Sequence, residues 1–100
     1  MKYALVGNND GPLRLLNALR KAQMRLPVFI GLQKTPDTYL LSKYRTEAKD
    51  IPLKINFGED DLIQLLTPYD PEVLINCFCN FKFVKLLTNY RCYNVHPSYL

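Results

Sequence analysis

Short apolar runs alternate with longer amphipathic stretches along the chain, and this alternation constrains the possible folds more than any other feature. "YALVG" (residues 3–7) is a continuous apolar run closed by a turn, which is typical of a strand buried on both faces. "VFIGL" (residues 28–32) repeats that pattern. The stretch between them is expected to place four apolar residues on one helical face: Leu15, Leu16, Leu19 and Ala22. Buried strands separated by helices indicate parallel βαβ units with right-handed crossovers.

The same alternation continues to the end of the chain. Thr35 before Pro36 predicts a helix start, with Leu40, Leu41 and Tyr44 turned inward. Pro52 favours an edge or a strand start for the third strand. The remaining expected elements are a helix over 35–49, a strand over 51–55, a helix over 58–66, a strand over 72–79, a short helix over 81–87 and a strand over 92–96. The sequence therefore predicts one α/β domain over 1–100: a Rossmann-like, open, mainly parallel twisted sheet with helices on both faces.

Composition narrows the class of protein. One hundred residues suit a single domain, and no stretch approaches the eighteen consecutive apolar residues of a membrane span. The N-terminus lacks the pattern of a signal peptide, and three cysteines without a disulfide framework favour a reducing compartment, so we expect a cytoplasmic protein without a membrane partner. Arg14, Lys21 and Arg25 are spaced to share a helix face. That spacing favours a solvated surface over one that steers an anionic substrate.

Three segments follow strands at the edge where open parallel sheets bind ligands. They are "GNND" after the first strand, "CFCN" after the fourth and "NVHPS" after the fifth. The turn over 7–11 leads into a helix and could offer backbone N–H groups to an anion. It matches neither a dinucleotide-binding nor a P-loop pattern, so a tight strand-to-helix turn is the favoured interpretation.

Two sets of reactive side chains lie near these strand ends. Cys77, Cys79, Cys92 and His96 have the composition of a zinc site. Positions two apart on a strand are about 6.7 Å apart, whereas sulfurs on one zinc ion lie within about 4 Å of each other. The spacing therefore favours small buried residues. Asn94 and His96 would project to one side of a strand, where an imidazole and an amide N–H suit acyl transfer. A hydrogen-bonded structural histidine is the commoner alternative.

The segment "CYNVHPSYL" resembles the N-x-H-x-S-x-L signature of the folate-dependent formyltransferases, which act on methionyl-tRNA, glycinamide ribonucleotide and amino sugars. "MKYALVGNND" is similar to that family's first strand and substrate loop, and "YDPEVLINCFCN" resembles the strand and turn before the signature. All 100 residues match the first half of the family's catalytic domain in order. The resemblance implies the same Rossmann-like fold.

The resemblance also implies an activity: transfer of a formyl group from N10-formyltetrahydrofolate to an amine. The amine would be a nucleotide-linked amino sugar, a ribonucleotide amine or an aminoacyl-tRNA. Asn94 would bind the formyl oxygen, His96 would assist proton transfer, and Ser98 would have a structural role. The turn expected to contact the pterin contains Phe78, Cys79, Asn80 and Phe81. The loop expected to face the acceptor contains Gly7, Asn8 and Asn9.

Two features depart from the family pattern. The turn after the fourth strand usually carries a glycine, but this chain has Cys77, Phe78 and Cys79 there. The family's third catalytic residue is an aspartate beyond the signature, and all six aspartates of this chain precede the motif. We therefore expect an amino-terminal fragment that is inactive alone and self-associates through an uncovered sheet edge. The alternative is a non-catalytic Rossmann-like module that binds an anionic metabolite or a partner chain.

Overall fold

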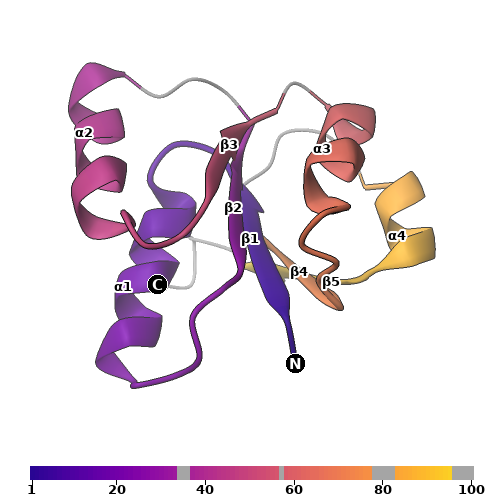
Figure 1. Cartoon of the computed structure of the whole chain (residues 1–100), viewed down its shortest axis with the longest axis horizontal. Helices are drawn as coiled ribbons and strands as arrows, with labels where there is room; N and C mark the ends of the chain where they lie inside the picture. The colour runs from indigo at the N-terminus through magenta and orange to yellow at the C-terminus, as the bar shows by residue number, and fades with distance from the viewer. Residues whose placement is uncertain (34–36, 57, 78–82, 96–100) are drawn as a thin grey trace.

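The computed structural model describes residues 1–33, 37–56, 58–77 and 83–95. Its elements are β1 (Tyr3–Gly7), α1 (Gly11–Lys21), β2 (Phe29–Leu32), α2 (Thr38–Glu47), β3 (Leu53–Ile55), α3 (Glu59–Leu66), β4 (Val73–Cys77), α4 (Lys85–Asn89) and β5 (Arg91–Val95). The five strands form one parallel sheet in the order β3-β2-β1-β4-β5 (Figure 1). The predicted α/β fold is confirmed, and so is the edge position that Pro52 favoured for β3. Within the described ranges, no helix combines the length and apolar character needed to cross a membrane.

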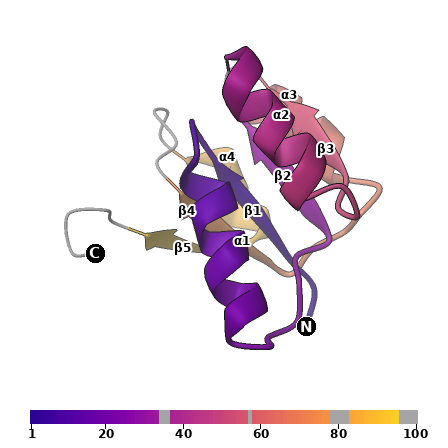
Figure 2. The same cartoon turned by 90° about the vertical axis from the view of Figure 1, so that its left-hand side faces the viewer.

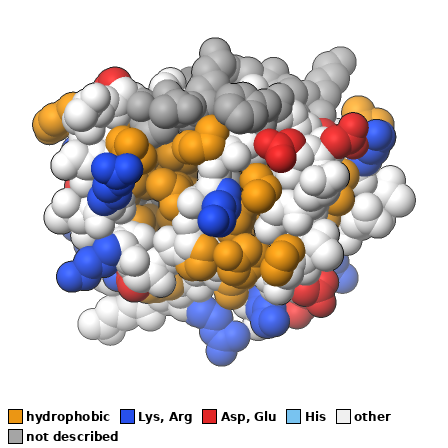
Figure 3. Space-filling view, turned by 45° about the horizontal axis from the view of Figure 1, so that its top comes forward, with side chains coloured by type: hydrophobic (Ala, Val, Ile, Leu, Met, Phe, Trp, Pro, Cys, Tyr) orange, Lys and Arg blue, Asp and Glu red, His pale blue; other side chains and the backbone are white. Residues whose placement is uncertain are grey.

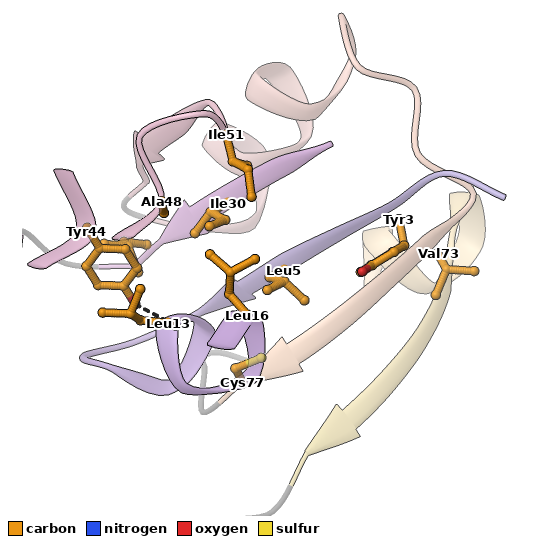
Figure 4. Packing of buried hydrophobic residues seen from close by; sticks show 11 residues of the cluster. Tyr3, Leu5, Leu13, Leu16, Ile30, Tyr44, Ala48, Ile51, Val73 and Cys77 are labelled. Atoms are coloured by element: carbon orange, nitrogen blue, oxygen red, sulfur yellow. Dashed lines mark hydrogen bonds between the residues drawn. The ribbon is translucent and has the colours of Figure 1, made fainter. Parts of the chain in front are cut away.

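Helices cover both faces of the sheet. α1 and α2 lie on one face, toward the viewer in Figure 2, and α3 and α4 lie on the other. Side chains of the central strand β1 alternate between two apolar clusters, with Leu5 in the cluster beneath α1 and α2 (Figure 4), and Ala4 and Val6 in the cluster beneath α3 and α4. β1 is thus buried on both faces, as its unbroken apolar sequence predicts.

The carboxyl ends of β1 and β4 approach each other closely. A Cβ atom placed on Gly7 would lie 2.0 Å from the backbone oxygen of Cys77. No side chain fits in that space, so glycine is required here by the contact between the two strands. This contact fixes the start of the turn that follows β1.

Helix α2 begins later than predicted. Asp37 is its N-cap, and Asp37 Oδ1 accepts a hydrogen bond from the Leu40 N–H at 2.8 Å. The expected start at Thr35 was therefore wrong, and Thr35 itself lies outside the described residues. Tyr44 is buried and Leu40 packs partly against the core, as expected.

Helix α4 also begins later than the predicted range of 81–87. Its first N–H groups are held by a residue of another helix: Glu59 accepts hydrogen bonds from the N–H groups of Val84, Lys85 and Leu86, those from Lys85 and Leu86 being 2.8 and 3.3 Å long. Desolvation opposes the charge on Glu59, yet these donors and the Lys85 ammonium lower the pKa of its carboxyl group below the usual value. Glu59, in the first turn of α3, therefore also caps α4.

The inward face of α1 differs from the expectation at two positions. Leu16 is buried and Leu15 and Leu19 are half-buried, as expected. Ala22, however, is the exposed C-cap, and Leu13, which was not predicted to face inward, is buried. Because α1 ends at Lys21, Arg25 lies beyond the helix and does not share a helix face with Arg14. The predicted basic helix face was therefore wrong.

Candidate functional site

The topology creates a switch point between β1 and β4. These strands are neighbours, but the chain leaves β1 toward β2 and leaves β4 toward β5, in opposite directions along the sheet. Open α/β sheets bind ligands outside the carboxyl ends of strands at such a point. The structure brings four of the predicted site residues to this edge: Gly7, Asn8, Asn9 and Asn94. The other predicted residues lie outside the described part of the chain: Phe78, Cys79, Asn80, Phe81, His96 and Ser98.

Asn8 holds the turn after β1 in place. Its N–H donates to the Cys77 backbone oxygen at 3.1 Å, and its own backbone oxygen accepts from the Gly11 N–H at 3.2 Å. Its side-chain Oδ1 accepts from the Asn9 N–H at 3.0 Å. Asn8 is only 8% exposed. These bonds give Asn8 a structural role in the turn.

The first N–H groups of α1 are occupied by bonds within the protein. The Gly11 and Arg14 N–H groups donate to backbone oxygens of the preceding turn, and Pro12 has no N–H. The Leu13 N–H donates to the Tyr44 hydroxyl oxygen at 3.3 Å. A helix N-terminus binds an anion through free N–H groups. The observed bonds favour the tight-turn interpretation over the anion-binding one.

Tyr44 of α2 clamps this turn through its hydroxyl group. Sequence reasoning assigned Tyr44 to the core alone and missed this second role. Its hydroxyl donates to the Asn9 backbone oxygen at 2.8 Å and accepts from Leu13 (Figure 4). Burial raises the pKa of the Tyr44 phenol far above its usual value, so the hydroxyl keeps the proton that it donates. Asn9 has φ 52° and an exposed side chain; asparagine is among the residues that tolerate this conformation. The Asn9 amide therefore faces solvent, as does the Asp10 carboxylate beside it, which lies 4.0 Å from Arg14.

Asn94 lies on β5 beside a second asparagine on β4. Asn76 and Asn94 are register partners, and Asn76 Nδ2 donates to Asn94 Oδ1 at 3.0 Å. Asn76 also pairs in register with Val6, so both amides lie on the face of the sheet that α3 and α4 cover. Sequence reasoning missed Asn76, because only the pairing of β4 with β5 brings the two side chains together. Asn9 and Asn94 thus lie at the same edge of the sheet, with Asn94 on the face that α3 and α4 cover.

The two described cysteines lie on opposite faces of the sheet. Cys77 belongs to the cluster beneath α1 and α2, and Cys92 packs against the cluster beneath α3 and α4. One zinc ion needs its ligands within a tetrahedron of about 2.3 Å bonds, so Cys77 and Cys92 do not share a metal. Burial raises the pKa of the Cys92 thiol, which leaves it less reactive. The described residues contain no group of three potential metal ligands.

Basic side chains are dispersed on the face shown in Figure 3, where they alternate with hydrophobic and polar groups. Several pair with acids at the surface: Arg20 lies 2.8 Å from Asp50, and Arg14 lies 4.0 Å from Asp10. Exposed pairs of this kind stabilise the fold little.

One apolar hollow lies away from the carboxyl edge. It has a volume of about 490 Å³ and is lined by residues that include Leu19 of α1, Ile75 of β4 and Tyr93 of β5. Neither α1 nor α2 lies in front of β5 in Figure 2. Tyr93 is 58% exposed. The walls of the hollow are mainly apolar.

Asn56 is an unusual buried residue at the carboxyl end of β3. Its backbone N–H donates to the Leu32 oxygen at 2.8 Å, but its fully buried side chain has no hydrogen-bond partner in the described part of the protein. The amide lies beside Gly31, where an added Cβ would be 3.3 Å from Asn56 Nδ2. An unpaired buried amide is destabilising.

Comparison with known proteins identifies no relative of the chain: no protein-family model, no curated protein and no solved structure matches it. The motif residues and the geometry of the carboxyl edge are therefore the grounds for assigning a function.

Proposed function

We propose that the chain forms part of the catalytic domain of a formyltransferase and binds N10-formyltetrahydrofolate at the carboxyl edge of the sheet. The observation that carries this proposal is the position of Asn94. It lies one residue before the end of β5, and its Oδ1 is occupied by Asn76. Its Nδ2 is then available as a donor at the place where the signature resemblance puts the formyl oxygen. An N–H donor aimed at a developing oxyanion is a major source of catalysis in acyl transfer.

The proposed reaction uses an amine as nucleophile. The amine nitrogen attacks the formyl carbon, the carbonyl electron pair moves to oxygen, and the Asn94 amide stabilises the resulting charge. The carbonyl then re-forms as the bond between the formyl carbon and N10 breaks. His96 takes the proton that the amine loses and returns it to N10 as the folate leaves.

The turn after β1 supplies the proposed contact with the acceptor. Asn9 presents an exposed neutral amide there, whereas Asn8 and the first N–H groups of α1 are already bonded within the protein. A neutral amide pairs well with hydroxyl and amine groups. This supports an acceptor whose sugar or ribose hydroxyls lie near its amine, such as an amino sugar, a ribonucleotide amine or the end of an aminoacyl-tRNA.

Binding of a formyl folate tests the proposal. We expect the chain to bind a 10-formyl folate analogue in calorimetry, and Asn94→Ala to weaken binding about two- to tenfold, as loss of one neutral hydrogen bond would. Asn89→Ala is the matched control, because Asn89 is exposed at the end of α4. Absence of binding at millimolar ligand, or equal affinities for Asn94→Ala and the wild type, would contradict the proposal.

A binding role without catalysis is the second candidate, and the surface near β5 favours it. β5 is the last strand of the sheet within the described part of the chain, and the exposed Tyr93 borders the apolar hollow. Unpaired edges associate with other strands. We propose that two copies pair through this edge, so light scattering should give a mass that rises with protein concentration. Tyr93→Lys should reduce that rise, while Tyr39→Lys, at a 75% exposed site on α2, should not. A constant monomer mass would contradict self-association.

A further inference from the structure

We propose that Asn76 is a positioning residue that decides which atom of Asn94 faces the formyl group. This inference rests on the proposed function and adds a residue to its site. The two asparagines are directly opposite each other in the β4–β5 register, and their amides lie on one face of the sheet. Asn76 is half-buried and Asn94 is exposed, so Asn76 is the inner partner of the pair.

The contact selects one of two orientations of the Asn94 amide. An asparagine amide is planar, and a half-turn about its last side-chain bond exchanges the positions of oxygen and nitrogen. Asn76 Nδ2 donates to Asn94 Oδ1 at 3.0 Å, which holds that oxygen toward β4. Nδ2 of Asn94 is then directed away from β4, and among the described residues it has no hydrogen-bond partner.

The orientation matters because only one of the two atoms stabilises an oxyanion. The amide nitrogen donates a hydrogen bond, whereas the amide oxygen would repel the charge that develops on the formyl oxygen. An exposed amide without a partner populates both orientations. One neutral hydrogen bond favours the productive orientation by about two- to tenfold. Asn76 thereby orders Asn94 before the substrate arrives.

The experiment inverts the hydrogen bond with a nearly isosteric substitution. In Asn76→Asp the ionised carboxylate only accepts, so it should draw Asn94 Nδ2 toward β4 and turn Oδ1 outward. When protonated, the carboxyl group can donate again and restore the original orientation. Asn76→Ala removes the partner without favouring either orientation. Asn89→Asp is the control, since it adds the same charge at an exposed site on α4.

The measured quantity is the formyl preference: the affinity for a 10-formyl folate analogue divided by the affinity for the same folate without its formyl group. The analogue should lack N5, because it then cannot cyclise in acid. We expect a wild-type preference of about two- to tenfold at pH 7, its loss in Asn76→Asp, and a smaller loss in Asn76→Ala. Below about pH 4, where aspartate is protonated, the Asn76→Asp preference should return toward the wild-type value. The Asn76→Ala preference should stay at the same fraction of the wild-type value at both pH values.

Other titrating groups near Asn94 are shared by every variant. They include Cys92 on the same strand and Glu59, whose charge acts on Cys92, and His96 follows Asn94 by two positions in the sequence, so the ratio to the wild type at each pH removes their contribution. Amide NMR spectra of each variant at both pH values check that the fold is retained. A loss of preference that returns in acid is not expected from a purely structural defect.

Failure of this inference differs from failure of the proposed function. If the wild type shows no formyl preference, the contact between Asn94 and the formyl group is absent, and both proposals are overturned. If the wild type shows the preference and Asn76→Asp keeps it at pH 7, only the role of Asn76 is overturned. Loss in Asn76→Asp with recovery in acid, and an unchanged Asn89→Asp, supports both.

Discussion

Replacing Tyr44 by phenylalanine should remove the two hydrogen bonds that hold the turn after β1, without leaving a large cavity. The ring stays in the core, but the hydroxyl that joins Leu13 to Asn9 is lost. Leu13 is 2% exposed, so its N–H group loses its partner in a site that water does not reach. An unsatisfied buried donor costs about 1–3 kcal/mol. The Asn9 oxygen is only partly buried and can be rehydrated, so it adds little. We expect the free energy of unfolding to fall by about 2 kcal/mol, a large part of the roughly 5–15 kcal/mol typical of a domain.

Urea denaturation followed by circular dichroism measures this change. For slopes of about 1–3 kcal/mol per molar urea, the midpoint of Tyr44→Phe should fall by about 1 M. Tyr39→Phe is the matched control on the same helix, because Tyr39 is 75% exposed, and its midpoint should not move. A Tyr44→Phe protein within about 0.5 kcal/mol of the wild type would refute the clamp, since even the low end of the unsatisfied-donor penalty exceeds that value.

Three further substitutions test the fold around the site. Gly7→Ala should destabilise the protein by more than about 3 kcal/mol, because its Cβ would lie 2.0 Å from the Cys77 backbone oxygen. The control Gly58→Ala should change stability far less, since a Cβ there has nothing within 4 Å, and equal effects of the two substitutions in denaturation would contradict the close approach. Asn56→Leu should leave stability unchanged or raise it, because it removes an unpaired buried amide at similar volume; a lower melting temperature would show that the amide is needed. Glu59 has a lowered pKa in the folded protein, so its contribution to stability is present above the unfolded pKa near 4.5 and is lost as pH falls through the folded value. Glu59→Gln should therefore show a weaker loss of stability in acid, and an unchanged pH dependence would rule out its cap on α4.

The strands were predictable because the burial pattern of each strand is visible in its own short stretch of sequence. β1 and β2 are buried on both faces, so each appears as an unbroken apolar run, and the helices between them imply parallel pairing. Pro52, which lacks an N–H, likewise indicated an edge or a strand start, and β3 is an edge strand that begins directly after it. These predictions needed no knowledge of distant contacts.

The errors occurred where distant residues decide the structure. α4 starts at Lys85 because Glu59, 26 positions earlier, accepts its N–H groups. The sequence around residue 81 contains no sign of that cap. For the same reason, the sequence did not reveal the hydrogen bond from the Tyr44 hydroxyl to the Asn9 backbone oxygen, because the two residues are 35 positions apart. α2 is a different case, because Thr35 and Asp37 are both good N-cap residues and only the structure shows that Asp37 is used.

The candidate site was predictable in its location but only partly in its members. Strand ends and a polar motif were enough to place Asn9 and Asn94 at one edge. Their environments were not visible in the sequence, because they depend on which strands pair. β4–β5 pairing puts Asn76 against Asn94, and the turn after β1 makes Asn8 structural while Asn9 stays exposed.

The most direct test of the proposed function is to map a bound formyl folate on the chain by two-dimensional amide NMR. The account predicts that addition of the 10-formyl analogue shifts signals at the carboxyl edge, including the side-chain amides of Asn94 and Asn76 and the signals of Asn9. Signals from the part of the apolar hollow that lies away from β5, such as Leu19 and Met24, should stay in place. Shifts confined to the hollow, or no shifts at millimolar ligand, would contradict a formyl-folate site at this edge.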